Sequence, residues 1–109
     1  MKRFLDFRLK EQKLEKSPSC SFDGIVSGSK GYLRARFSFS KEWSGCACVA
    51  VFRKLLDEEN VVLHNGECEI PPSILDYDKF YVRIVGRNSS GAQLTTNEVE
   101  VTQIRGGGV

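Results

Sequence analysis

Apolar and polar residues alternate with a period of two along most of this chain. Successive side chains of a β-strand point to opposite faces of the sheet, so this alternation predicts strands with one buried face. The pattern is clearest over residues 32–40, and it recurs near the N-terminus and in the second half of the chain. The apolar positions expected on buried faces are Leu5, Phe7, Leu9, Leu33, Ala35, Phe37, Phe39, Phe52, Phe80, Val82, Ile84, Val99 and Val101.

One segment, residues 46–55, is apolar on both of its faces. A strand of this kind is usually covered on both sides, and a single core covers only one of them. The other face needs cover from a neighbouring element, for which residues 2–14 are one candidate, or from another chain. Without internal cover, the exposed patch would mark a surface for self-association or docking. The arginines expected to help there are Arg34, Arg36 and Arg83.

Clusters of turn-forming residues separate the strands. Asn65-Gly66 is a hairpin signal, and it predicts that residues 67–70 pair with a short strand at residues 61–63. Residues 15–30 contain several glycines and serines and are expected to be loop. Further turns are expected at residues 41–45, 57–60 and 88–91.

The strand count predicts the fold class. Residues 71–75 are expected to form a short helical turn, because proline is tolerated in a first turn. The last strand, residues 92–104, is expected to bulge near Asn97, where its apolar positions change face. About seven or eight short strands with almost no helix predict an all-β, immunoglobulin-like antiparallel β-sandwich. We expect residues 1–105 to form this single domain and residues 106–109 to be a flexible Gly-rich tail or linker start.

Size and charge exclude several classes of function. A chain of 109 residues and 12.2 kDa is expected to fold as one domain, without needing metals or disulfides. Its net charge of +2 is too small to predict nucleic-acid binding. Its apolar runs are far shorter than the roughly 18 residues of a membrane span, so no membrane partner is expected. Residues 1–11 alternate apolar and charged side chains, unlike the continuous apolar stretch of a signal peptide.

The four cysteines are Cys20, Cys46, Cys48 and Cys68, and three interpretations of them were weighed. Zinc needs about four converging ligands, and C-x-C inside an apolar strand is not the tight loop of a zinc knuckle. An antibody-type disulfide framework would place a Tyr two residues before its second Cys, where this chain has Gly66. We therefore interpret the cysteines as reduced thiols, with Cys46 and Cys48 in the core.

Catalytic chemistry has little support in the pattern. The only histidine, His64, adjoins the predicted Asn65-Gly66 hairpin turn, where a side chain is usually solvated. Glu98 and Glu100 lie on the outer face of a predicted strand, and the glycines of residues 24–31 open no helix that could hold phosphate. The protein is expected to be no enzyme, with no catalytic, cofactor-binding or metal-binding residues.

Arginine and tyrosine gather at outward positions of two predicted strands. These residue types are enriched at protein interfaces, although a solvated sheet face would have the same pattern. The candidate interface consists of Tyr32, Arg34, Arg36, Tyr81, Arg83 and Arg87.

An ordered series of short sequence motifs over residues 32–103 resembles those of a known family. The motifs are Phe37 and Phe39, Glu42-Trp43-Ser44-Gly45, Phe52, Cys68-Glu69-Ile70-Pro71, Leu75 and Thr95-Thr96-Asn97. Together they are similar to the N-terminal immunoglobulin-like domain of baseplate upper proteins and tail-fibre proteins of phages that infect Gram-positive bacteria. Trp43 is expected to cap one end of the core, with Gly45 allowing its close approach.

The resemblance implies a structural or attachment module of a phage or prophage tail. Such a module docks to other tail proteins or to itself, is made in the bacterial cytoplasm and resides in the virion. One alternative is a module that recognises a host cell-wall glycan or surface protein. A groove lined by exposed aromatic side chains would favour glycan recognition. A second alternative is a small phage-encoded inhibitor of a host protein.

Overall fold

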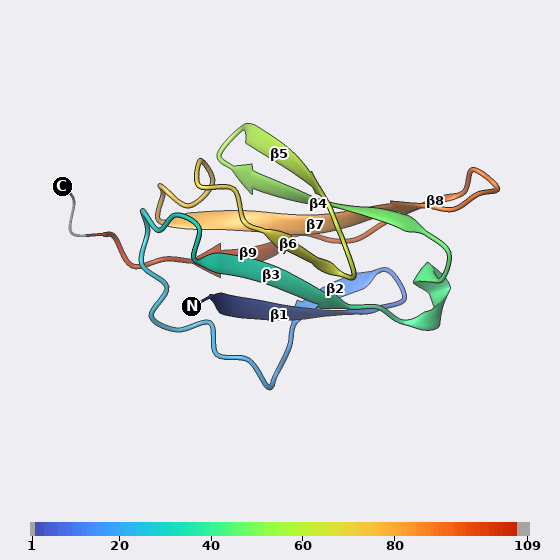
Figure 1. Ribbon diagram of the computed structural model, residues 1–109, viewed down its shortest axis with the longest axis horizontal. Coiled ribbons are helices and arrows are strands. Elements are labelled where there is room, and N and C mark those ends of the chain that lie inside the picture. Colours follow the sequence, from blue (N-terminus) through green and yellow to red (C-terminus); the bar gives the residue numbers. More distant parts are fainter. Residues whose placement is uncertain (1, 107–109) are drawn as a thin grey trace.

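Two β-sheets pack face to face in the computed structural model, which describes residues 2–106 (Figure 1). The first sheet has the strand order β2-β1-β3-β6, and the second has the order β5-β4-β7-β8, with β9 also paired to β7. The first-sheet strands are β1 (Arg3–Lys10), β2 (Lys13–Lys16), β3 (Leu33–Ser38) and β6 (Glu67–Glu69). The second-sheet strands are β4 (Ala47–Lys54), β5 (Asp57–Val62), β7 (Lys79–Arg87), β8 (Gln93–Thr95) and β9 (Val99–Thr102). The predicted all-β sandwich is confirmed, with nine strands in the described part of the chain.

The two sheets differ in their strand directions. Every pair in the second sheet is antiparallel, whereas β1 and β3 of the first sheet run parallel, with Leu5 opposite Ala35 and Phe7 opposite Phe37. A parallel pair needs a long connection between its strands. Here the connection is β2, which pairs antiparallel with β1, followed by the long loop that leads back to the start of β3. β2 lies at the start of the segment that the sequence predicted as loop.

The core fills the space between the sheets and includes most of the predicted side chains, together with others such as Leu14, Ile70 and Leu75. Phe7 stacks on Phe37 with ring centroids 5.1 Å apart, and Phe52 lies 6.2 Å from Phe80. Of the thirteen positions expected on buried faces, eleven are buried, and Phe39 and Val99 are partly buried against the core. Burying one such large apolar side chain stabilises the fold by about 1.5–3 kcal/mol.

The turn predicted at residues 57–60 is wrong, because this acidic stretch forms most of β5. The chain instead reverses at Leu55 and Leu56, so that Lys54 pairs with Asp57 and the next pair is Arg53 with Glu58. Opposite charges directly across an antiparallel pair stabilise the register. The acidic residues therefore suit a strand beside the basic end of β4.

The turn at Asn65-Gly66 is confirmed, but its consequence for pairing is different. Both residues have positive φ, 54° and 74°, as the central pair of a type I′ turn requires. Only His64 and Glu67 bridge across this turn, whereas β6 beyond it pairs with β3. The prediction that residues 67–70 pair with residues 61–63 is therefore wrong, and the chain crosses here from the second sheet to the first.

A bulge interrupts the last strand, as predicted. Val85 of β7 lies opposite Thr95, and Val82 lies opposite Val99. Two residues separate the partners on β7 and three separate them on the other strand, which is the extra residue that defines a bulge. The extra residue divides the predicted strand into β8 and β9 and frees the Asn97 side chain for contacts outside the ladder.

The connections at the ends of the sandwich match the predictions in part. Residues 41–43 form the 3-10 helix η1 within the predicted turn. Consecutive hydrogen bonds from Ile74 N–H to the Pro71 carbonyl and from Leu75 N–H to the Pro72 carbonyl form the predicted turn after β6. The Gly-rich tail predicted at residues 106–109 falls mostly outside the described residues, of which only Gly106 is part.

Candidate functional site

The outer face of the second sheet has an apolar end, built by one row of valines across three strands. Val49 of β4 lies opposite Val62 of β5 on one side and Val85 of β7 on the other. Val62 is 60% exposed, and Val49 and Val85 are partly exposed. A depression of about 310 Å³ lies over this row and is lined by Ala47, Val49, Val85, Arg87 and Gln93. We call Ala47, Val49, Val62 and Val85 the valine patch.

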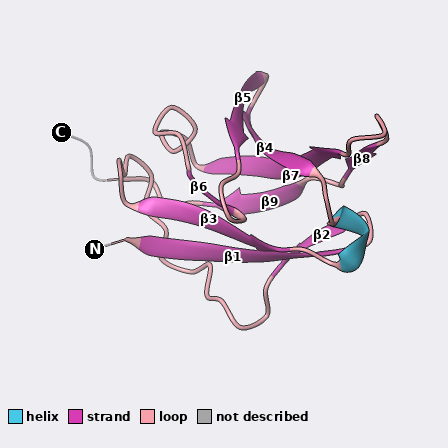
Figure 2. Ribbon diagram, turned by 45° about the vertical axis from the view of Figure 1, so that its right-hand side comes forward, coloured by secondary structure: helices cyan, strands magenta, loops and turns pink. Residues whose placement is uncertain are grey.

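The N-terminal segment does not cover the valine patch. β1 lies in the opposite sheet (Figure 2). Its Leu5, Phe7 and Leu9 side chains are buried in the core between the sheets. The prediction that residues 2–14 cover the outer face of the two-sided strand is therefore unsupported: this segment builds the other half of the sandwich. The patch stays exposed within the described part of the chain.

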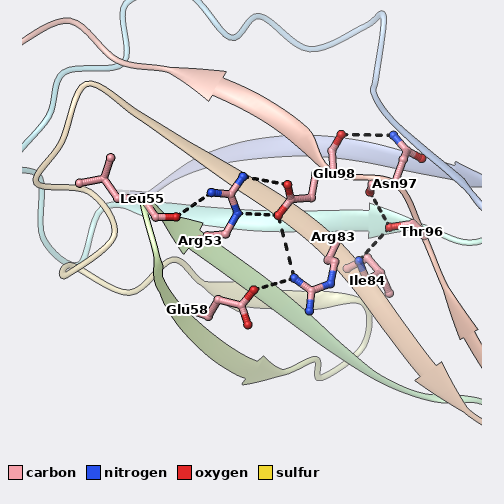
Figure 3. Close-up of polar contacts among 8 residues, drawn as sticks. All are labelled: Arg53, Leu55, Glu58, Arg83, Ile84, Thr96, Asn97 and Glu98. Atoms are coloured by element: carbon pink, nitrogen blue, oxygen red, sulfur yellow. Dashed lines mark hydrogen bonds and ion pairs between the residues drawn. The ribbon is translucent and has the colours of Figure 1, made fainter.

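The other end of the same face is polar and internally paired (Figure 3). Arg53 donates two hydrogen bonds to the Glu98 carboxylate, from Nε at 2.8 Å and from Nη2 at 2.9 Å. Arg83 lies 3.0 Å from Glu58 and 4.0 Å from Glu98, so one carboxylate faces two guanidinium groups. The Arg53 guanidinium also lies 4.3 Å from the ring centroid of Tyr81. The bidentate geometry fixes the direction of both side chains.

The charges of this network shift one another's pKa values. The hydrogen bonds from Arg53 hold the pKa of the Glu98 carboxyl below its usual range, and Arg53 and Arg83 add electrostatic attraction. The same pairing raises the pKa of Arg53. Both partners thus stay charged across the physiological range, and the network acts as a fixed polar border beside the valine patch.

The structure divides the predicted arginine–tyrosine interface between two surfaces. Tyr32, Arg34 and Arg36 lie at or on β3 of the first sheet, whereas Tyr81, Arg83 and Arg87 lie on β7 of the second. Because the sheets pack face to face, their outward side chains point in opposite directions (Figure 2). These six residues therefore do not form one continuous surface.

The predicted arginines also have partners within the chain. Arg36 makes a bidentate contact with Asp6 at 2.7 and 3.1 Å and lies 4.4 Å from the ring centroid of Phe4. Arg34 lies 3.8 Å from Glu67, and the Arg87 guanidinium donates to Gln93 at 2.8 Å. These contacts are exposed or partly exposed, so each contributes only about 0–1 kcal/mol to stability.

A second hollow lies at one end of the sandwich, and we call it the end pocket. It has a volume of about 380 Å³ and lies between η1 and the Asn65-Gly66 turn. Its lining includes Phe39, Lys41, Trp43, Cys46, Cys48, Val62 and Leu63. Trp43 forms its floor: the ring is 3% exposed, and its Nε1–H donates to the Glu11 carbonyl at 2.7 Å. The predicted role of Trp43 as a cap on the core is thus supported.

The glycine that leaves space for the Trp43 ring is Gly86 rather than Gly45. A Cβ at residue 86 would lie 2.8 Å from Trp43 Cζ3, whereas a Cβ at residue 45 would meet nothing within 4 Å. Gly45 instead has a φ of 77°, a conformation that other residues adopt with strain. The Trp43 ring therefore packs closely against β7, across the core, and not against a glycine of its own turn.

The cysteines are free thiols in the described structure, and only one of them lies in the core. Cys68 is buried, and this burial raises the pKa of its thiol to about 12. Cys46 and Cys48 are half-buried and line the end pocket, which corrects the prediction that both are buried in the core, although Cys48 packs against it. Cys46 precedes β4, so it is outside the strand alternation that suggested its burial.

Residues with catalytic or ligand chemistry are dispersed. Among residues 2–106, no three His, Cys, Asp or Glu side chains come together in an arrangement that could hold a metal ion. The described part of the chain also contains no helix that is both long enough and apolar enough to cross a membrane.

Sequence reasoning missed four residues that contribute to these surfaces. Val62 and Val85 were assigned to strands without a known neighbour, so their alignment beside Val49 was not visible. The turn at Leu55 and Leu56 was missed because it has no Gly, Asn or Pro to signal it, and Leu55 was placed at the end of the preceding strand.

Comparison with known proteins adds no relative, since neither a family model nor a curated protein nor a solved structure matches the chain.

Proposed function

We propose that this protein is a non-enzymatic docking module of a phage or prophage tail, which binds other tail proteins through the outer face of its second sheet. The resemblance of residues 32–103 to baseplate and tail-fibre domains motivates the tail context. The exposed valine patch is the single structural observation that carries the docking role.

The patch suits protein contact for two physical reasons. Contiguous apolar surface on a soluble protein is limited in extent, and a patch rimmed by polar residues is typical of an interaction site. Here the apolar row of Val62, Val49 and Val85 adjoins the ordered Arg53–Glu98 network. A protein interface has the same arrangement, with an apolar centre and a polar rim.

Glycan recognition is the alternative function, and the end pocket, whose lining includes Phe39 and Trp43, is a candidate site for it. Sugar rings bind by stacking on exposed aromatic faces. Trp43, however, is 3% exposed and is held against the core by its hydrogen bond to Glu11. Only Phe39 remains as a partly exposed ring in the lining. The geometry therefore favours protein docking over sugar binding.

The experiment measures binding between the purified chain and each tail protein of the same phage or prophage. Biolayer interferometry with the wild type should identify at least one tail component. Val49→Asp places a charge at the centre of the patch and should weaken that binding at least tenfold, which is about 1.4 kcal/mol. Thr95→Arg adds bulk beside Val85, its partner across the ladder, and should act in the same direction.

Val26→Asp is the matched control, because Val26 is an exposed valine outside the patch. Circular dichroism should show that all three variants keep the wild-type fold. Equal binding by Val49→Asp and the wild type would contradict docking through the patch. A wild type that binds none of the tail proteins but binds a cell-wall saccharide would support the glycan alternative instead.

A further inference from the structure

The hairpin formed by β4 and β5 ends in two exposed leucines. Leu55 is 55% exposed and Leu56 is 95% exposed, and together they form the turn between Lys54 and Asp57. This hairpin projects from the edge of the second sheet (Figure 1). Adjacent leucines in such a position leave an apolar knob in water, which a turn of polar residues would avoid.

The backbone and the neighbouring charges hold this knob in place. Leu55 has a φ of 55°, a left-handed conformation that leucine rarely adopts. Arg53 Nη1 donates to the Leu55 carbonyl at 2.6 Å (Figure 3). Lys54 Nζ donates to Asp76 at 2.7 Å. A strained residue held by its surroundings is often part of a functional contact. The turn therefore presents its leucines in a fixed direction.

The end pocket lies at the opposite end of the same hairpin. Its lining includes Ala47 and Cys48 at the start of β4, and Val62 and Leu63 at and just after the end of β5. The ladder between the knob and the pocket runs from the Val49–Val62 pair to the Lys54–Asp57 pair. At about 3.3 Å per residue, the knob and the pocket are roughly 20 Å apart and open in opposite directions along the hairpin.

The two ends carry opposite charges. Asp57 flanks the knob, and Lys41 lines the pocket; neither makes an ion pair with another described residue. Lys54, on the other side of the knob, is paired with Asp76. Arg87 adds a second cation close to the pocket, in the adjoining depression. The pocket volume of about 380 Å³ leaves room for leucine side chains. The knob would thus bring Asp57 towards Lys41.

We propose that the Leu55-Leu56 knob of one molecule inserts into the end pocket of a second copy of the same chain, head to tail. This deepens the proposed docking function by naming one partner. Its test variants change Leu56, Cys46 and Lys41, which lie outside the valine patch, although the pocket shares Ala47 and Val62 with that patch. Because the knob and the pocket are different surfaces, the contact is heterologous, and repeated contacts form a ring or an open filament. Each molecule then offers one knob and one pocket.

Complementary variants test this arrangement. Leu56→Asp removes the knob and leaves the pocket, whereas Cys46→Trp fills the pocket and leaves the knob. Sedimentation of the wild type should show a mass that rises with concentration above 12.2 kDa, up to about 1 mM, the range in which weak contacts form. Each variant alone should lose association at least tenfold, and their equimolar mixture should give a one-to-one species of twice the monomer mass.

Two further variants provide a control and a second test of the pocket. Ile104→Asp changes an apolar residue that is 59% exposed elsewhere, and it should associate like the wild type. Lys41→Glu tests the pocket without filling it, in case Cys46→Trp fails to fold, and should also lose association at least tenfold. A wild type that stays monomeric at about 1 mM would overturn the proposal. So would a mixture of knob and pocket variants that does not pair.

The same measurements distinguish a failure of the head-to-tail contact from a failure of the proposed docking function. A monomeric wild type that still binds tail proteins through Val49 would end the head-to-tail contact alone. A wild type that associates through Leu56 but binds no tail protein would support the contact and contradict docking to other tail proteins.

Discussion

The side-chain amide of Asn97 forms two hydrogen bonds with the main chain of Leu14 and thereby joins the two sheets. Leu14 N–H donates to Asn97 Oδ1 at 2.8 Å, and Asn97 Nδ2 donates to the Leu14 carbonyl at 3.0 Å. Leu14 belongs to β2, an edge strand of the first sheet, and Asn97 lies in the bulge of the second. The amide thus supplies the donor and the acceptor that a neighbouring strand would supply to this edge.

Replacing Asn97 with Ala should destabilise the fold by about 1–3 kcal/mol, because it leaves the Leu14 N–H and carbonyl without these partners. Asn97→Asp keeps the acceptor and loses the donor, so its effect should be smaller. Urea unfolding measures both. Asn88→Ala is the control, since its side chain bonds only within its own turn. An Asn97→Ala variant as stable as the wild type would show that water replaces the amide at no cost.

Gly86→Ala should cost about 1–3 kcal/mol, the usual penalty for overpacking a core. The added methyl would lie 2.8 Å from Trp43 Cζ3 and 3.2 Å from Cys48 Sγ. A double-mutant cycle with Trp43→Leu isolates the clash, because removing the ring should recover most of the penalty. Equal costs of Gly86→Ala in both backgrounds would assign the effect to the strand backbone instead of the tryptophan.

Stability should fall as the pH rises above about 9, with Cys68 as one cause. Burial raises the pKa of its thiol to about 12, so the folded state holds a proton that the unfolded state releases at lower pH. This contribution is fully present below the unfolded pKa and is lost as the pH rises from about 9 towards 12. Between pH 9 and pH 10.5 the loss should be about 1.5 kcal/mol, because the slope approaches about 1.36 kcal/mol per pH unit only once the unfolded thiol is fully ionised.

Cys68→Val tests the assignment, because valine removes the titrating group and keeps an apolar side chain in its place. Thermal unfolding at pH 7, 9 and 10.5 should show a shallower alkaline decline for this variant than for the wild type. Cys46→Val is the control and should retain the wild-type slope. Parallel declines for all three proteins would place the alkaline sensitivity in other groups.

Leu55→Asn should stabilise the fold by about 0.5–1 kcal/mol, since asparagine adopts the left-handed conformation more readily than leucine. Leu56→Asn is the matched control: Leu56 is not among the residues with positive φ, so no gain is expected from it. Urea unfolding at low protein concentration avoids any contribution from association. A loss of stability in Leu55→Asn would mean that the leucine makes a favourable contact that outweighs its backbone strain.

Local alternation was enough to predict the sandwich and most of its core. Each strand carries its own period of two, so the facing of residues such as Phe37, Phe80 and Val101 follows from the strand alone. The bulge near Asn97 and the turn at Asn65-Gly66 were predictable for the same reason, since a change of face and a preference for positive φ are local properties.

Features that depend on pairing between distant segments were not accessible in this way. Nothing in the period of β1 says that it lies beside β3 and runs parallel to it, so the segment was considered as one candidate cover for the outer face of β4. The acidic residues of β5 resemble a turn until Arg53 and Arg83 are placed opposite Glu58. Local composition does not show this, because the stabilising charge comes from another strand.

The candidate surfaces belong to this second group. The Arg and Tyr residues expected to point outward lie on β3 and β7, except Tyr32, which precedes β3. Which sheet each strand joins decides whether they form one surface, and β3 and β7 join opposite sheets. The valine patch arises only when Val62, Val49 and Val85 align across three strands. An alternating pattern determines which side chains leave the core, whereas strand order and register determine which of them become neighbours, because neighbours in a sheet are distant in the chain.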